Sequence, residues 1–158
     1  MPRLTADTHA RRAEEHAKVG RLMVQVGAEW GAVCLFYSAY HLVKRALILD
    51  PVFDNPVALA QVDLPEAARH PESHRGHTRS GGGRVWGVSD LVLKLYAPLE
   101  QPYKRLTVAS HHVRYGRGFR GGAVGLQRLE QDLATIEQAS AAGIMCGPMP
   151  MPTAVRRP

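Results

Sequence analysis

The stretch AEWGAVCLFYSAYHLVKRALIL, residues Ala28 to Leu49, is the part of the chain around which the rest can be placed. At helical spacing, one face of this stretch consists of Trp30, Cys34, Tyr37, His41 and Ile48. The opposite face consists of Leu35, Ala39, Leu42, Ala46 and Leu49. A helix that is apolar on nearly all sides must be buried all round. The stretch therefore predicts the central helix of an all-α domain.

We do not expect this helix to cross a membrane. Ser38, Tyr40 and His41 interrupt its apolar run, and Lys44 and Arg45 follow. A membrane-spanning helix needs about 20 predominantly apolar residues in a row. The charged start of the chain, MPRLTADTHARRAEE, also lacks the apolar segment of a secretory signal.

Outside the central stretch, the periodicity predicts further helices. A first helix from Asp7 to Val26, capped by Asp7 or Thr8, packs against the central one as a hairpin across Gly27. Asp50-Pro51 ends the central helix, because a residue before proline avoids the helical region. The later helices are expected over residues 55–61, from Ser89 to about Tyr96, over 102–115 and over 126–141.

Between these helices the sequence predicts three irregular segments. Residues 63–87 are rich in Pro, Gly, His and Arg, which indicates a long exposed basic loop that is mobile near 80–83. A glycine-rich basic link follows at 116–125. The prolines after residue 143 predict a disordered tail, so the chain divides into one helical domain (1–142) and a tail (143–158).

The composition favours an anionic partner. The formal net charge is +6, the sequence pI is near 9.7, and most of the positive charge is on arginine. Arginine donates two parallel hydrogen bonds to phosphate, so nucleic acid is the first partner to consider, although arginine used for solubility explains the excess equally well. The two cysteines, Cys34 and Cys146, are too few for a disulfide framework and favour a cytoplasmic location.

The segment FYSAYHLVKRAL, residues 36–47, resembles the second helix of HEPN domains (higher eukaryotes and prokaryotes nucleotide-binding). Arg114-Tyr115, at the end of a later predicted helix, resembles a second part of their pattern. The resemblance implies an up-and-down bundle of four to five helices that forms a homodimer. It also implies a metal-independent ribonuclease of toxin–antitoxin or phage-defence type, whose active site is an Arg followed about four to six residues later by a His, contributed by both subunits.

Arg105 followed by His111 or His112 fits that spacing. In such a site, the arginine stabilises the charge on the phosphorus centre and the histidine moves a proton between the 2′-hydroxyl and the leaving oxygen. The same spacing also occurs at Arg3–His9, Arg11–His16 and Arg69–His74, so it discriminates weakly. His41, on the aromatic face of the central helix, is read either as a hydrogen-bonded core histidine or as a third catalytic residue.

Two basic segments are candidates for nucleic-acid contact. They contribute Arg69, Arg75, Arg79, Arg84, Arg114, Arg117 and Arg120. In the second segment, arginines alternate with Tyr115 and Phe119, which suits contact to phosphates and stacking on bases. In the first, His70, His74 and His77 have helical metal-ligand spacing, but Pro71 and Gly76 oppose a helix, so we expect no metal site there. A solvated loop and a flexible link are the plainer alternatives.

The resulting hypothesis is an RNA- or nucleotide-binding HEPN-like protein that needs no cofactor. Its partners are RNA or a nucleotide, a second copy of the chain, and an antitoxin or assembly partner. The alternative is a catalytically inactive binding module or a helical scaffold in a larger assembly.

Overall fold

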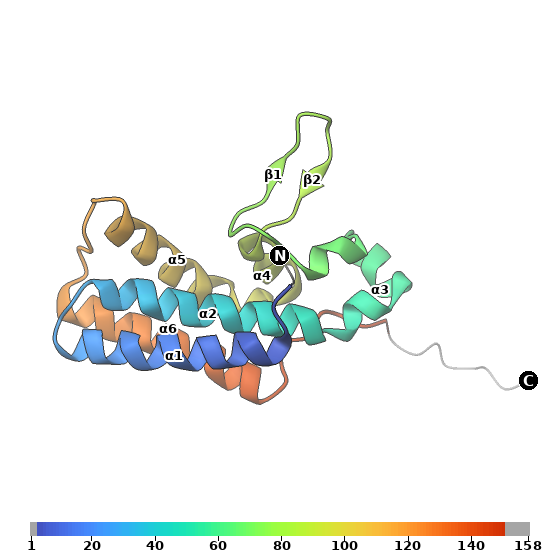
Figure 1. Ribbon diagram of the computed structural model, residues 1–158. Helices are drawn as coiled ribbons and strands as arrows, with labels where there is room; N and C mark the ends of the chain where they lie inside the picture. Colours follow the sequence, from blue (N-terminus) through green and yellow to red (C-terminus); the bar gives the residue numbers. More distant parts are fainter. Residues whose placement is uncertain (1–2, 151–158) are drawn as a thin grey trace, which may run out of the picture.

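The computed structural model describes residues 3–150, and four long α-helices make up most of them. They are α1 (Ala6–Gln25), α2 (Trp30–Leu49), α5 (Glu100–Arg114) and α6 (Gly122–Ala141). In this set each helix runs opposite to the one before it, and α2 packs against all three others (Figure 1). The prediction of an all-α helical bundle is confirmed.

Helix α2 is central, as its pattern predicts. Leu35, Phe36, Ala39, Val43 and Leu47 along its middle are completely buried. Its two ends differ from the expectation of burial on all sides, because Trp30 and Leu49 are more than half exposed. By length and composition alone, residues Trp30–Asp54 also meet the requirements of a membrane span, and half of that window is buried inside the bundle.

The α1–α2 hairpin depends on small residues. Gly27 turns the chain with a positive φ of 69°. Gly20 allows close packing, because a Cβ there would lie 2.8 Å from Cδ2 of Leu35. The hydroxyl of Thr5 caps α1 by accepting from the Thr8 N–H at 3.2 Å, so the helix begins one residue earlier than predicted and Asp7 lies in its first turn.

The segment after α2 follows the prediction closely. Asp50 ends α2 and begins a 3₁₀ turn, η1 (Pro51–Asp54). The side chain of Asn55 then accepts from the N–H groups of Val57 and Ala58, both at 3.0 Å, and caps α3 (Pro56–Gln61).

The predicted exposed loop at 63–87 is more ordered than expected. It contains a 3₁₀ turn, η2 (Glu66–Arg69), and a small antiparallel hairpin of β1 (His77–Thr78) and β2 (Arg84–Val85) that projects from one end of the bundle (Figure 1). Leu64 and Ala68 are buried. The carboxylate of Asp90 holds the base of the hairpin, because it accepts from the N–H groups of Gly76 (2.8 Å) and Gly87 (2.9 Å).

The remaining helices begin earlier than the sequence indicated. Helix α4 (Val88–Leu95) follows Gly87 as its N-cap residue, and the Gly87 N–H donates to the carboxylate of Asp90 rather than to the hydroxyl of Ser89. A 3₁₀ turn, η3 (Ala97–Leu99), leads into α5 at Glu100, two residues before the predicted start. Helix α6 begins at Gly122, which shortens the predicted glycine-rich link.

The first part of the predicted disordered tail is packed on the bundle, which corrects that expectation for residues 144–150. Met145 is buried, and the Gly147 N–H donates to the Asp50 carboxylate at 2.7 Å. Asp50 is itself buried and also accepts from the Tyr96 hydroxyl at 2.8 Å. A contact with a residue nearly a hundred positions earlier is invisible to local composition. The rest of the tail, residues 151–158, lies outside the described residues.

Candidate functional site

Six aromatic polar side chains gather where α1, α2 and the segment before β1 meet. These residues, called the His–Tyr cluster below, are His9, His16, Tyr37, Tyr40, His41 and His74. On α1, His9 and His16 lie seven residues apart and so share a face, and on α2, Tyr37 and His41 lie one turn apart. Packing α1 on α2 therefore brings the imidazoles together.

The centre of the cluster is a direct contact between two buried histidines. Nδ1 of His9 lies 2.8 Å from Nδ1 of His41. In such a contact, one ring carries its proton on Nδ1 and the other leaves Nδ1 free to accept. The His16 ring stacks on the rings of His41 and Tyr37, with a distance of 5.6 Å between ring centroids in each case. The ring centroid of His74 lies 4.5 Å from that of Tyr40.

The histidines of the cluster are uncharged at neutral pH. Burial, together with the nearby Lys44 and Arg12 cations, lowers the pKa of His9 from 6.5 to about 4. Burial, together with His9, His16 and the same two cations, lowers the pKa of His41 to about 3. The pKa values of His16 and His74 are also lowered, mainly by burial. The cluster therefore offers neutral imidazoles, each with one unprotonated nitrogen that can accept a hydrogen bond.

A cavity of about 250 Å³ opens onto this cluster, and most of its charged side chains are positive. Arg3, Arg12 and Lys44 line it beside His9, His41 and His70, and Glu72 is the one carboxylate among the lining residues described. Lys44 also donates to the backbone carbonyl of Pro71, and burial lowers the pKa of its ammonium group. This cavity, called the cluster cavity below, is suited to an anion.

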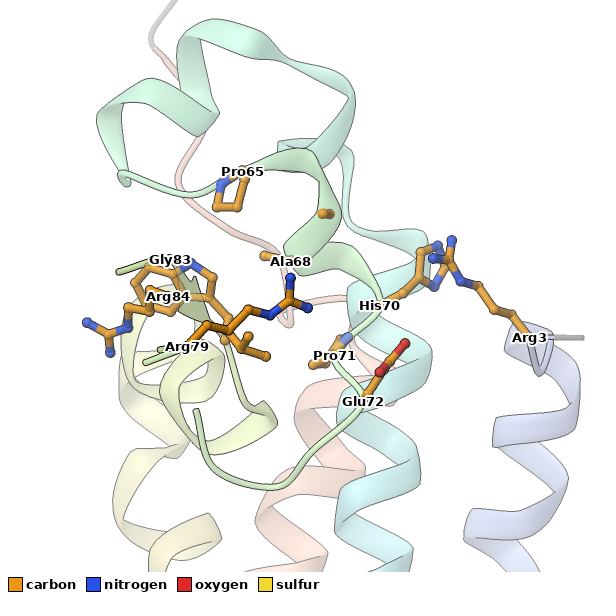
Figure 2. Close-up of a pocket in the computed structure, with 12 residues that line it drawn as sticks. Arg3, Pro65, Ala68, His70, Pro71, Glu72, Arg79, Gly83 and Arg84 are labelled. Carbon is orange, nitrogen blue, oxygen red and sulfur yellow. The ribbon is translucent and has the colours of Figure 1, made fainter. Parts of the chain in front are cut away.

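A second cavity, of about 290 Å³, lies between the β1–β2 hairpin and η2 and adjoins the first. It is called the hairpin cavity below. Arg3, His70, Pro71 and Glu72 line both cavities. In Figure 2, Arg79 reaches from the hairpin into this space, while the guanidinium of Arg84 points out of it. The Arg84 guanidinium instead lies over the Trp86 ring, with its Cζ 4.0 Å from the ring centroid, and Nζ of Lys94 lies 4.9 Å from the same centroid.

The three predicted catalytic residues do not meet within one chain. Both nitrogens of the Arg105 fork donate to the buried Asp132 carboxylate, at 2.8 and 2.7 Å. His111 is exposed and lies against Tyr115, and six residues along a helix place it about 120° around α5 from Arg105. His112 shares a groove with Arg105, whereas His41 belongs to the His–Tyr cluster.

The predicted nucleic-acid-binding arginines divide into engaged and exposed ones. Arg69 pairs with Asp54 and lies over the Phe53 ring, so it has a structural role. Arg114 joins the cluster, because it donates to the Tyr37 hydroxyl at 3.2 Å. Arg79 and Arg84 flank the hairpin cavity. The other three, Arg75, Arg117 and Arg120, are exposed.

Sequence reasoning missed the contribution of α1. His9, Arg12 and His16 are spaced by three and four residues, which places all three on one helical face. That polar stripe on a helix that packs against His41 was the available signal. His70, His74 and His77 have no common helical face, because η2 ends at Arg69 and His77 lies in β1. Within residues 3–150, no three His, Cys, Asp or Glu side chains are placed to share a metal ion.

No protein-family model matches this chain, and comparisons with curated proteins and with solved structures also returned no match.

Proposed function

We propose that this chain is an HEPN-like protein that binds RNA or a nucleotide, with phosphate held at the cluster cavity. The observation that carries the proposal is that Arg3, Arg12 and Lys44 line one cavity together with Tyr40 and the neutral His9 and His41. Fixed cations attract phosphate, and arginine binds it with two hydrogen bonds. Uncharged imidazoles and phenol groups add hydrogen bonds that suit sugar hydroxyls and bases.

The adjoining hairpin cavity supports a ligand longer than one phosphate. Arg3 and His70 border both cavities, and Arg79 lies on the far side of the second. A polynucleotide can therefore meet a series of cations from α1 to the hairpin. The Trp86 ring is less suited to stack on a base, because Arg84 and Lys94 already lie over it.

The proposal is tested by RNA binding measured as fluorescence anisotropy of a labelled single-stranded oligonucleotide over a range of salt. The double variant Arg3→Gln/Arg12→Gln should bind more weakly, and its plot of log K against log salt should be shallower by about 0.7 per lost phosphate contact. The matched control is Arg11→Gln/Lys18→Gln, which removes two exposed α1 cations that do not line the cluster cavity. Equal weakening in both variants would mean diffuse attraction rather than a site.

A second candidate function, metal-independent RNA cleavage, is favoured by the His9–His41 contact. Of two neutral rings joined through Nδ1, one has an unprotonated Nε2 and the other an Nε2–H. The first can take the proton of a 2′-hydroxyl as its oxygen attacks the adjacent phosphorus. That ring then passes its Nδ1 proton to the second ring, whose Nε2–H protonates the departing 5′-oxygen. The products are a 2′,3′-cyclic phosphate and a 5′-hydroxyl, and Arg12 is the nearby cation for the phosphorus centre.

Incubation of a mixed RNA pool with the protein in EDTA tests the cleavage candidate. If the histidine pair acts, cleavage survives EDTA, disappears in His41→Gln and persists in Arg105→Gln and His111→Gln. Loss in the last two variants instead would assign the reaction to the pair indicated by the HEPN resemblance. No cleavage together with salt-sensitive binding would leave the binding function alone.

A further inference from the structure

A groove of about 440 Å³ between α5 and α6 is separate from the cavities described above. Its floor is apolar and is formed by Val108, Ala109, Phe119 and Leu129. Pockets for small molecules commonly have volumes of about 300–1,000 Å³ and mostly apolar linings with a few convergent polar groups. The groove therefore has the size and the floor of a small-molecule site.

Phe119 is a fixed wall of this groove. Its ring lies so close to α6 that a Cβ at Gly121 would come within 2.5 Å of it and a Cβ at Gly125 within 2.8 Å. The Phe119 N–H also donates to the Glu29 carboxylate at 3.2 Å, which ties this segment to the start of α2. Glycines at these two positions thus let an aromatic ring cover part of α6.

The rim of the groove is positively charged. Lys104, Arg105, Arg120 and Arg128 line it, and the His112 ring lies among them. Asp132, which does not line the groove, is buried and accepts two hydrogen bonds from Arg105, with Arg128 at 3.8 Å. Lys104 and Arg120 have no ion pair with any other residue in 3–150. The rim therefore has uncompensated positive charge next to apolar surface.

We propose that this groove binds a small anionic amphiphile, with a carboxylate, sulfonate or phosphate head on an aryl or acyl body. The head group pairs with Lys104 and Arg120, and the body covers Val108, Phe119 and Leu129. A polynucleotide fits less well, because its phosphates would engage the rim and leave the apolar floor in water. The groove is thus a second site, independent of RNA binding at the cluster cavity.

The experiment uses 8-anilinonaphthalene-1-sulfonate as the probe on the full-length folded protein. Its fluorescence should rise in a saturable one-site manner. Decanoate should displace the probe, and decyltrimethylammonium of the same chain length should not. Binding should weaken about tenfold in Lys104→Glu/Arg120→Glu, because two head-group contacts become repulsive. Val108→Asp, at a partly exposed floor position, should weaken it with the rim intact.

The matched control for charge is Arg11→Glu/Lys18→Glu, which makes the same change in net charge on the exposed face of α1 and should retain the affinity. The proposal is overturned if both double variants lose affinity equally, or if the decyl cation displaces the probe as well as decanoate does. Displacement by polyuridylate at low concentration would also overturn it, since the groove would then be part of an RNA surface.

Discussion

Arg105 is paired with the buried Asp132 carboxylate, and this pair opposes its predicted catalytic role. A buried carboxylate that accepts two charge-assisted hydrogen bonds is costly to leave without its partner. Any catalytic use of Arg105 requires the guanidinium to leave this pair. The residue therefore has a structural role that spacing along the sequence could not reveal.

Replacing Arg105 by Gln should lower the free energy of unfolding by about 2–3 kcal/mol, because Asp132 stays buried with a weaker donor. The measurement is equilibrium denaturation in urea. Arg128→Gln is the matched control, since Arg128 approaches the same carboxylate from the exposed surface at 3.8 Å, and should change stability by less than about 0.5 kcal/mol. Equal effects would contradict the distinction.

The His9–His41 pair predicts a dependence of stability on acid. The folded-state pKa values, about 4 and about 3, lie below the ordinary value of 6.5. The unfolded chain therefore binds more protons as the pH falls below 6.5, and stability that is fully present above that pH is lost as the pH falls toward about 4 for His9 and about 3 for His41. His16 and His74 contribute in the same direction.

Denaturation curves between pH 7.5 and about 4.5 measure this effect, because each extra proton on the unfolded state adds a slope of about 1.4 kcal/mol per pH unit. His41→Gln should reduce the slope near pH 5.5 by about 1.4 kcal/mol per pH unit, which corresponds to one proton. An unchanged slope in the variant would show that His41 is not buried in its neutral form.

The β1–β2 hairpin is an element whose position depends on two glycines. A Cβ at Gly87 would lie 2.2 Å from the carbonyl carbon of Arg75, and a Cβ at Gly76 would lie 2.2 Å from Oδ2 of Asp90. At these distances the backbone at the base of the hairpin has to move. The hairpin carries Arg79, so its base also determines whether that cation faces the hairpin cavity.

Gly87→Ala should therefore lower the free energy of unfolding by about 2 kcal/mol or free the hairpin locally. Thermal unfolding detects the first effect, and faster amide hydrogen exchange at Arg79, whose N–H donates to Gly83 at 2.8 Å, detects the second. Gly81→Ala is the control, because a Cβ there meets nothing within 4 Å. Matching behaviour of the two variants would contradict the proposed role of Gly87.

Across the whole molecule, the sequence predicts well what depends on near neighbours. Helical periodicity located α2, and the Asn55-Pro56 pair located α3, because caps and helical faces involve residues a few positions apart. The hairpin base and the packed segment at 144–150 were missed, because Asp90 reaches back to Gly76 and Asp50 reaches forward to Gly147.

Distance along the sequence also explains why the partners of the predicted site residues were missed. His41 was selected from its helix face, but its partner His9 lies 32 residues earlier. Arg105 was selected by spacing, but its partner Asp132 lies 27 residues later. Side chains far apart in sequence meet only through the packing of α1, α2, α5 and α6, and a single sequence does not show that packing.

The central claim is that RNA phosphate binds at the cluster cavity, and histidine side-chain NMR tests it most directly. Uniformly labelled protein is titrated with a short oligouridylate near neutral pH, and the imidazole signals are followed. The account predicts saturable shifts at His9, His41 and His70, which line the cavity, with His77 on the hairpin strand and His112 in the α5–α6 groove unchanged. Shifts confined to His111 and His112, or none at concentrations that saturate the anisotropy signal, would contradict it.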